Sequence, residues 1–374
     1  MVFHVNLCLY EITVQDRERL NPSELANILA EHIHRCQQLQ IIWDVYDDFC
    51  QFAEGVSHLR APVLQSIHIC REDERVPQSI PEDAPFMRVF EGGAPSLQSL
   101  KTRGIQLGVF LPPLESVSLV ELHRYDLSDI GSWTNFKDIL GGLPFLKHLI
   151  INGDIISSWP SDSNTIPLLA LTNLRVRASS DGTSSHFPRF LNAILCPLLE
   201  DLFVEMVIIS EMNEYLQLTS RIPKFPLLRS LTFFPPLSQH LDEPLWAYMA
   251  IAFPTITHIT YCISRCNQFI SFVEGHLSMS LFPDEFRWPD ALPWPNLQII
   301  TLINRYRFPT SPLEQLQQMM STRANSNHPL RKVQLPQEML NNIVPSDSVT
   351  VEASSLYNHL NEDNYDIEWM LDEN

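Results

Sequence analysis

The sequence has few basic residues, little glycine and no long hydrophobic run. It holds 25 lysine and arginine residues against 44 aspartate and glutamate residues, which leaves a net charge of −19, and only 11 glycines. This deficit of positive charge argues against a general nucleic-acid binder, because neutralising phosphates requires clustered basic side chains. It also argues against docking on an anionic membrane surface. No stretch of 18 or more apolar residues is present, so we expect no membrane span.

Disulfide, metal and targeting signals are also missing. The seven cysteines are an odd number scattered along the chain, which argues against a disulfide framework. Cys262 and Cys266 form a C-x-x-x-C without a second pair of ligands nearby, so we expect no metal site. The opening MVFHVNLCLYEITVQDRERL lacks the basic start of a secretory signal. We therefore expect reduced thiols and an intracellular location, in the cytoplasm or the nucleus.

The familiar motifs of enzymes do not occur in the chain. There is no phosphate-binding glycine loop, no G-x-S-x-G elbow and no H-E-x-x-H helix. His32 and His34 are two residues apart, so on a helix they face different sides. Glu200 and Asp201 are adjacent, and nothing marks them as an acid/base pair. We expect no catalytic residue and no cofactor. The remote alternative is an enzyme whose site is assembled only by folding.

Proline, in contrast, is plentiful, and it recurs in one setting. The stretch CPLLEDLFV (196–204) has a proline two residues before a leucine, with apolar side chains three and five residues beyond that leucine. Two looser copies follow Pro167 and Pro329, and a further copy without proline starts at Cys36. Eight copies keep the proline in register, after Pro62, Pro95, Pro112, Pro144, Pro197, Pro226, Pro254 and Pro295, and in the copy after Pro95 the last position is Thr102. A unit repeated in this way defines the whole fold.

The chemistry of this repeat predicts strands stacked in parallel. Leucines spaced L-x-x-L-x-L place the last two side chains on one face of a strand. Proline fixes φ and lacks an N–H, so it suits the start of such a strand. In the copy after Pro112 the spacing assigns Leu114, Val117 and Leu119 to the core and exposes Val120.

Amphipathic segments separate the strands. Parallel strands need a crossover, and the segments between them have apolar residues near helical spacing. We expect helices in FKDILGGL (136–143), FPRFLNAIL (187–195), SEMNEYLQLTSRI (210–222), LWAYMAIAF (245–253) and SPLEQLQQMMSTRA (311–324). The sequence therefore predicts an α/β fold: an irregular, right-handed leucine-rich-repeat solenoid, horseshoe-like, with parallel strands on its concave face.

The two ends of the chain differ from the repeats. We expect a strand–helix cap over 1–35, the solenoid over 36–340, and a C-terminal segment over 341–374. In the cap, Asn21 is a candidate N-cap of a helix and Glu24 can complete a capping box. Residues 361–374 hold six acidic side chains and no basic one, which is typical of a solvated tail. The alternative is an acidic peptide that anchors a partner.

Several phrases of the chain resemble the repeat region of fungal F-box-like leucine-rich-repeat proteins. They are HIHRCQQLQII (32–42), GGAPSLQSLKTRGIQL (92–107), LPPLESVSL (111–119), LPFLKHLIING (143–153), FPLLRSLTF (225–233) and WPNLQIITL (294–302). In that family an F-box before the repeats docks on the linker subunit of a cullin-RING ubiquitin ligase, while the repeats hold the substrate. The F-box itself is not visible here, although LPQEMLNNIV (335–344) is similar to an F-box opening.

The resemblance implies a protein-binding module, the substrate-recognition region of an F-box-type ligase adaptor. The alternative is a stand-alone binding scaffold, and in both cases we expect protein partners but no nucleic acid and no membrane. Partners would bind side chains between the core leucines, and Thr260 and Thr301 are among those that we expect to be exposed. The candidate binding residues on this concave face are Lys101, Arg103, His148, Arg175, Arg177, Phe203, Glu205 and Phe234. Four basic residues on one face predict an acidic partner, with the two phenylalanines as anchors. A face that merely keeps the protein soluble is the other explanation.

Overall fold

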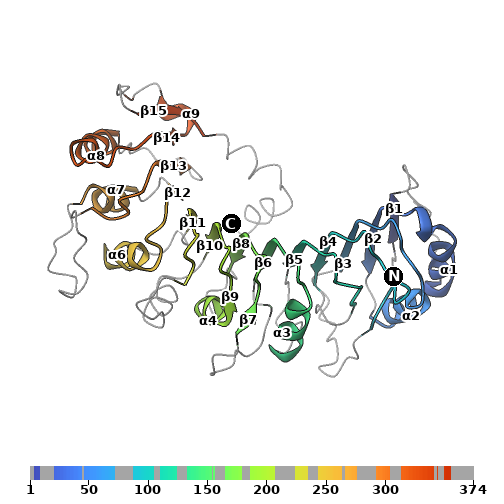
Figure 1. The fold of residues 1–374 in the computed structure, drawn as a ribbon. Helices are drawn as coiled ribbons and strands as arrows, with labels where there is room; N and C mark the ends of the chain where they lie inside the picture. Colours follow the sequence, from blue (N-terminus) through green and yellow to red (C-terminus); the bar gives the residue numbers. More distant parts are fainter. Residues whose placement is uncertain are drawn as a thin grey trace. The chain divides into compact units, whose positions relative to one another are not determined.

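The chain divides into two compact units, which are described one at a time. Unit 1 is Met1–Leu199 and unit 2 is Glu200–Asn374. The computed structural model (Figure 1) describes residues 4–8, 21–43, 46–71, 87–104, 110–123, 133–153, 155, 165–178, 186–206, 224–234, 243–262, 266–275, 292–303, 313–340, 343 and 349–354. The segment 210–222, for which we expect a helix, and the acidic residues 361–374 lie outside this part.

Unit 1 contains one open, almost wholly parallel sheet. Its strands are β1 (His4–Cys8), β2 (Gln38–Trp43), β3 (Ser66–Arg71), β4 (Ser99–Arg103), β5 (Leu119–His123), β6 (His148–Asn152) and β8 (Asn173–Arg177). They lie side by side in this order. The first strand is antiparallel to β2, and every later pair is parallel. Two short strands, β7 (Ile166–Pro167) and β9 (Ile194–Leu195), form a separate parallel pair.

The helices of unit 1 occupy the crossovers between its strands. They are α1 (Pro22–His32) with a 3₁₀ turn η1 (Ile33–Arg35), α2 (Tyr46–Val56), α3 (Trp133–Gly141) and α4 (His186–Ala193). Figure 1 shows α2, α3 and α4 below the strands, on one side of the sheet. The helices expected over 136–143 and 187–195 are confirmed within a few residues. The sequence analysis overlooked α2, although its buried Phe49, Phe52, Ala53 and Val56 keep a helical period.

Helix α1 begins as its sequence predicts. The side chain of Asn21 accepts a hydrogen bond from Ser23 N at 3.0 Å, and Glu24 Oε2 accepts one from Asn21 N at 3.4 Å. Pro22 occupies the first helical turn, where its missing N–H costs nothing. These contacts satisfy amide groups that a helix start leaves without intrahelical partners, and the predicted capping box is confirmed.

Unit 2 repeats the same plan with an entirely parallel sheet. Its strands, in spatial order, are β10 (Asp201–Glu205), β11 (Ser230–Phe234), β12 (His258–Cys262), β13 (Ile299–Ile303), β14 (Lys332–Leu335) and β15 (Thr350–Ala353). Its helices are α6 (Glu243–Ala252), α7 (Cys266–Glu274), α8 (Leu313–Asn325) and the short α9 (Gln337–Leu340). The helices expected over 245–253 and 311–324 are thus confirmed, while α7 was not predicted.

A tight turn precedes most of the strands, and the repeated prolines lie in it. In the turn before β6, Leu146 N donates to Leu143 O at 3.3 Å, with Pro144 as the second of four residues. Equivalent bonds close the turns that contain Pro62, Pro95, Pro197, Pro226 and Pro295, at 3.0–3.4 Å. Proline favours this position because its fixed φ matches the turn. The sequence analysis placed proline at the start of the strand, and the structure moves its role to the turn before it.

In most repeats the same pair of hydrogen bonds joins the residue after the turn and the first strand residue to the residue after the preceding turn. Lys147 N and His148 N both donate to Ser118 O, at 2.8 and 3.0 Å, and Thr172 N and Asn173 N both donate to Lys147 O at 3.0 Å. In unit 2 the carbonyl of Arg229 accepts from Thr257 N and His258 N in the same way. One carbonyl with two acceptor sites therefore sets the register of each strand against its neighbour.

The register of β5 differs from the sequence expectation by three residues. Val117 and Val120 are fully buried and Leu122 nearly so, whereas Leu119 is half-buried. Pairing of Leu100 with Val120 fixes this arrangement. The sequence around Pro112 contains two overlapping copies of the apolar spacing, and only the pairing with β4 selects one of them. The outward side chains of β5 are consequently Leu119, Glu121 and His123.

In unit 2, one arginine is buried in the layer of helices. Arg323 of α8 is fully buried and donates to Trp294 O at 2.9 Å, Pro293 O at 3.2 Å and Val273 O at 3.4 Å. Burial lowers the pKa of its guanidinium to about 10. The side chain joins α8 to the end of α7 and to the turn before β13, so it holds three segments of unit 2 together.

The first prediction tests the register of β5. Val120→Asp should lower the free energy of unfolding by more than about 4 kcal/mol, because it places a carboxylate in the core. Leu119→Asp, one residue away, should change it by less than about 1 kcal/mol, because that side chain faces outward. Urea unfolding of both variants measures the difference. A larger loss for Leu119→Asp would restore the register expected from the sequence.

The second prediction concerns Arg323. Arg323→Met keeps an unbranched apolar stem but removes the guanidinium and leaves three buried carbonyls without their donor, so we expect a loss of about 2–4 kcal/mol of unfolding free energy. Arg331→Met, which changes an exposed arginine before β14, is the matched control and should stay within about 0.5 kcal/mol. Equal thermal and urea midpoints for the two variants would show that the buried guanidinium is dispensable.

Candidate functional site

The outward side of the sheet in unit 1 carries the residues that are available to a partner. On strands β2–β6 and β8, alternate side chains are buried, such as Leu149 and Ile151 of β6. The side chains between them are half-buried or exposed. They are Gln38, Gln40, Ile42, Ser66, His68, Cys70, Ser99, Lys101, Arg103, Leu119, Glu121, His123, His148, Ile150, Asn152, Asn173, Arg175 and Arg177, and we call them the outer face of unit 1.

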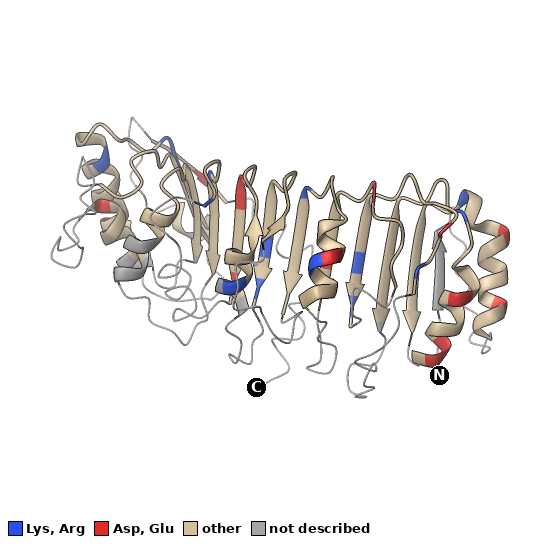
Figure 2. Cartoon of the chain, turned by 60° about the horizontal axis from the view of Figure 1, so that its bottom comes forward, with Lys and Arg blue, Asp and Glu red and all other residues tan. Residues whose placement is uncertain are grey.

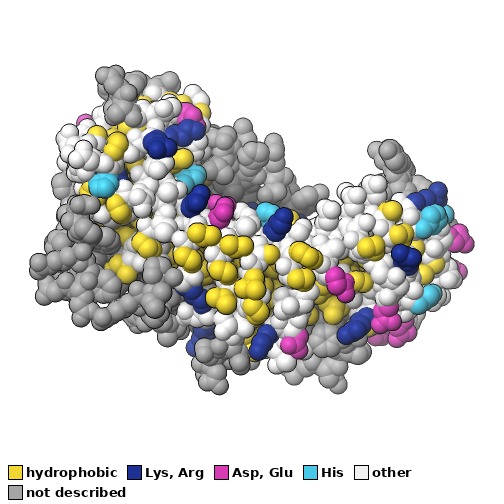
Figure 3. Space-filling view, in the orientation of Figure 1, with side chains coloured by type: hydrophobic (Ala, Val, Ile, Leu, Met, Phe, Trp, Pro, Cys, Tyr) yellow, Lys and Arg dark blue, Asp and Glu magenta, His cyan; other side chains and the backbone are white. Residues whose placement is uncertain are grey.

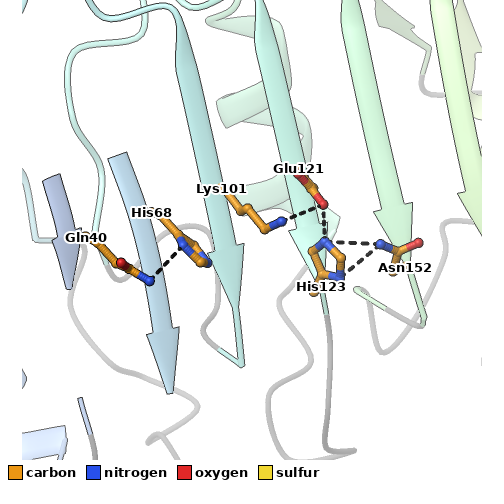
Figure 4. A network of polar contacts seen from close by, with 6 residues as sticks. All are labelled: Gln40, His68, Lys101, Glu121, His123 and Asn152. Carbon is orange, nitrogen blue, oxygen red and sulfur yellow. Dashed lines mark hydrogen bonds and ion pairs between the residues drawn. The ribbon is translucent and has the colours of Figure 1, made fainter. Parts of the chain in front are cut away.

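A network of polar contacts crosses the middle of the outer face of unit 1 (Figure 4). Lys101 Nζ lies 3.0 Å from Glu121 Oε1, and the same oxygen contacts His123 Nε2. Asn152 Nδ2 lies 2.9 Å from His123 Nδ1, so the chain of contacts spans β4, β5 and β6. On β2 and β3, a separate contact joins Gln40 Nε2 to His68 Nδ1 at 3.4 Å.

The carboxylate of Glu121 is the electrostatic centre of this network. Burial alone would raise its pKa, but the hydrogen bond and charge of His123 and the charge of Lys101 outweigh burial and lower the pKa to about 2. Glu121 is therefore ionised at neutral pH. Its charge is balanced by its neighbours, so the centre of the network presents little net negative charge to an incoming group.

His68 is held in its neutral form beside this network. Burial of the ring lowers its pKa to about 4, and the positive charge of Lys101 on the next strand acts in the same direction. Its Nε2 atom is buried and has no hydrogen-bond partner among the residues that the structure describes. A neutral imidazole tolerates this better than a charged one, because an unpaired buried charge costs far more than an unpaired neutral group.

The network holds its side chains in place rather than preparing a reaction. His123 has the carboxylate partner that a general base needs, but both of its ring nitrogens contact Asn152 or Glu121. The nearest thiol in its row, Cys70, is two strands away, beyond Arg103. Within the described part of the chain, no group of three or more His, Cys, Asp or Glu side chains could hold a metal ion.

The structure brings the predicted basic residues together as two pairs, not as one cluster. Lys101 and Arg103 lie on β4, and Arg175 and Arg177 lie on β8. Strands β5 and β6 separate the pairs, and the exposed His148 lies at the start of β6. Figure 2 shows that basic residues occur on strands as well as on helices.

The other three predicted residues belong to unit 2, and two of them are not exposed. Phe203 and Phe234 are neighbours on β10 and β11, as expected, with ring centroids 5.5 Å apart in an edge-to-face arrangement. This packing covers Phe234, which is only 2% exposed, and Glu205 beside it is 1% exposed. Neither can serve as a surface anchor in this structure, so their expected exposure is corrected.

Two threonines of unit 2 are also buried where the sequence analysis expected exposure. Thr260 and Thr301 are 2% and 0% exposed. Thr301 Oγ1 lies 2.9 Å from His258 Nε2 and donates to Gln334 Oε1 at 2.7 Å. Gln334 Nε2 in turn donates to Glu352 Oε1 at 2.7 Å. Thr301 is thus in contact with larger side chains of both adjacent strands, a situation that alternation along one strand does not reveal.

Sequence reasoning missed the two central residues of the network. The register expected from the copy after Pro112 is three residues too early. It therefore placed Ser116 and Ser118 on the surface, where the structure has Leu119 and Glu121. The overlapping apolar pair Val120 and Leu122 was the available signal. An alignment of this second pair with Leu100 and Thr102 of β4 would have found the outward Glu121.

A row of apolar side chains lies at the turns before the strands. In the described residues of unit 1, Phe145 is 60% exposed, Leu169 57%, and Leu195 and Leu198 45% each. Phe145, Leu169 and Leu198 are turn residues of three successive repeats. In Figure 3 hydrophobic side chains gather over the region where β6 and β8 lie in Figure 1. This row lies outside the strand positions from which the sequence predicts a binding face.

The third prediction uses the pKa of His68. Because its folded pKa is about 4 and its unfolded pKa is about 6.5, the unfolded chain takes up the proton more readily between these values, and stability falls as pH drops through this window. From pH 7 to pH 5 the loss should be about 1 kcal/mol, a value reduced for the exposed part of the ring. His68→Gln should remove this contribution in urea titrations at both pH values.

His148→Gln is the control for this pH experiment, since it removes an exposed histidine from the outer face of unit 1. We expect its unfolding free energy to follow the wild-type pH dependence. If His68→Gln loses as much stability on acidification as the wild type does, His68 is not the neutral buried group described above.

Comparisons with known proteins add no identification. No protein-family model matches the chain, and no curated protein matches it significantly. Among the described residues, no helix is long and apolar enough to cross a membrane. The fold class therefore rests on the structure itself: an α/β protein with open parallel sheets, six parallel strands in each unit.

Proposed function

We propose that the chain is a leucine-rich-repeat solenoid that binds a protein partner on the outer face of unit 1. The repeat proposal is supported by strands that pair with their neighbours in sequence, by helices in several crossovers, and by one turn that recurs before the strands. In such arrays each repeat contacts only its neighbours, and the row of strands provides an extended binding surface.

The observation that carries the binding proposal is the charge of the outer face of unit 1. It holds four basic residues, Lys101, Arg103, Arg175 and Arg177, and one acidic residue, Glu121, within a chain of net charge −19. Glu121 is already paired with Lys101. Local charge opposite to that of the whole molecule favours an acidic partner segment and steers it to this face.

The resemblance to fungal F-box-like repeat proteins suggests what the binding serves. We propose substrate recognition for a cullin-RING ubiquitin ligase, with the acidic segment belonging to the substrate. A stand-alone scaffold that binds the same kind of segment is the second candidate. The F-box-like run LPQEMLNNIV begins inside strand β14. Neither candidate requires catalysis, a cofactor, nucleic acid or a membrane.

The fourth prediction tests the binding face. Affinity purification from cells, followed by quantitative mass spectrometry, compares the wild type with a variant in which Lys101, Arg103, Arg175 and Arg177 are changed to Glu. We expect the specific partners to fall at least about tenfold, because several charge contacts of modest strength are reversed together. Recovery of a cullin and its linker subunit with the wild type supports the ligase role, and recovery of other proteins alone supports the scaffold.

A matched control distinguishes the loss of basic residues on the outer face of unit 1 from a general effect of net charge. Changing Arg35, Arg60, Lys147 and Arg189 to Glu alters net charge equally at exposed positions outside the outer face of unit 1. This control should keep the wild-type partners. If the outer-face variant also keeps them, while both variants remain folded by circular dichroism, the binding proposal is wrong.

A further inference from the structure

The distance between the two basic pairs indicates how far apart the anionic groups of a partner should be. This inference rests on the proposed binding function. The ladder pairs Arg103 with His123, His123 with Asn152 and Asn152 with Arg177. Arg103 and Arg177 are thus three strand steps apart in one row. Neighbouring strands lie about 4.8 Å apart, so the two arginines are separated by about 14 Å at the backbone.

This separation matches an extended peptide that lies across the strands. An extended chain rises about 3.4 Å per residue, so four residues span about 14 Å. Because side chains alternate, residues i, i+2 and i+4 of such a peptide would face the sheet. An acidic residue at i and another at i+4 would therefore reach Arg103 and Arg177 together, with the middle side chain above β5 and β6.

The row through Arg103 fits two acidic groups better than the parallel row through Lys101. The Lys101 row continues to Glu121, Ile150 and Arg175. Lys101 is already paired with Glu121 at 3.0 Å, so it is less available to a carboxylate of the peptide. The Arg103 row has His123 and Asn152 in between, and it contains no acidic residue. The amide group of Asn152 can still form a hydrogen bond with a small polar side chain at i+2.

Intramolecular contacts of the two arginines do not prevent this binding. Arg103 and Arg177 also interact within the chain, and both are half-buried. A guanidinium has five N–H donors, so it can keep one contact while it takes up a carboxylate or a phosphate. The half-buried setting shields the contact from solvent and strengthens it relative to one at a fully exposed lysine.

We propose that the outer face of unit 1 recognises an extended segment with two anionic side chains four residues apart, seated on Arg103 and Arg177. A carboxylate and a phosphorylated serine offer the same anionic chemistry. With either group, two anionic side chains four residues apart are needed, because a single one can contact only one of the two arginines.

Fluorescence anisotropy with synthetic peptides tests this spacing. Fluorescein-labelled nonapeptides of glycine and serine carry two glutamates either four or two residues apart, and a second set carries phosphoserine at the same positions. With the full-length chain we expect the four-residue spacing to bind at least about fivefold tighter than the two-residue spacing, because only it engages both arginines. Preference in the phosphoserine set alone would support the geometry and identify a phosphorylated source.

Paired variants assign the effect to the two arginines. Arg103→Gln with Arg177→Gln should abolish the preference for the four-residue spacing, while Arg35→Gln with Arg60→Gln should leave it intact. Equal affinity for both spacings in the wild type, or a preference that survives the first pair of substitutions, would overturn the inference.

The outcome can be separated from that of the proposed function. If spacing has no effect but the four-site charge reversal still removes cellular partners, the face binds proteins and only the two-anion geometry is wrong. If charge reversal leaves the cellular partners unchanged, the proposed function itself fails, whatever the peptides show.

Discussion

The double hydrogen bond between successive turns is the interaction on which the structure depends. The carbonyl that follows one turn, such as Ser118 O or Arg229 O, accepts hydrogen bonds from two amides that follow the next turn. The turn before it is closed by its own bond across four residues, and a proline usually fixes its shape. Because the strand follows immediately, these backbone bonds and the register of the strand agree with each other. The buried ladders through Leu100, Val120 and Leu149 then follow from that register.

The same backbone pairing determines which polar side chains meet on the outer face of unit 1. Lys101 of β4 meets Glu121 of β5 because the two strands start at matching positions, and His123 is two residues beyond Glu121 on the same strand. A difference of one residue in register would turn these polar side chains into the core and expose the apolar ones. The network of Figure 4 is therefore a consequence of backbone pairing, and the low pKa values of Glu121 and His68 follow from where that pairing places them.

Much of the architecture could be predicted from the sequence, since the proline–leucine spacing marks the strands and helical periods mark most crossovers. The predictions were wrong where the sequence fits two registers equally well, or where burial depends on residues of other strands. Around Pro112 two copies of the apolar spacing overlap, and only pairing with β4 distinguishes them. Phe234 and Thr301 are buried by side chains of neighbouring strands. The alternation of residues within one strand does not predict this burial. The basic residues were found, but their division into two pairs requires the order of the strands.

The way in which the turns bind to one another also bears on how such a chain changes over evolutionary time. Each turn offers the same acceptor to the turn that follows and the same two donors to the turn that precedes. A duplicated or deleted unit of turn, strand and crossover would therefore find compatible partners on both sides. The length of the array and the distance between charged residues in one row can therefore change together, in whole steps of one strand. Gain or loss of a repeat would then change the spacing of the segment that is recognised, without remodelling of the surface.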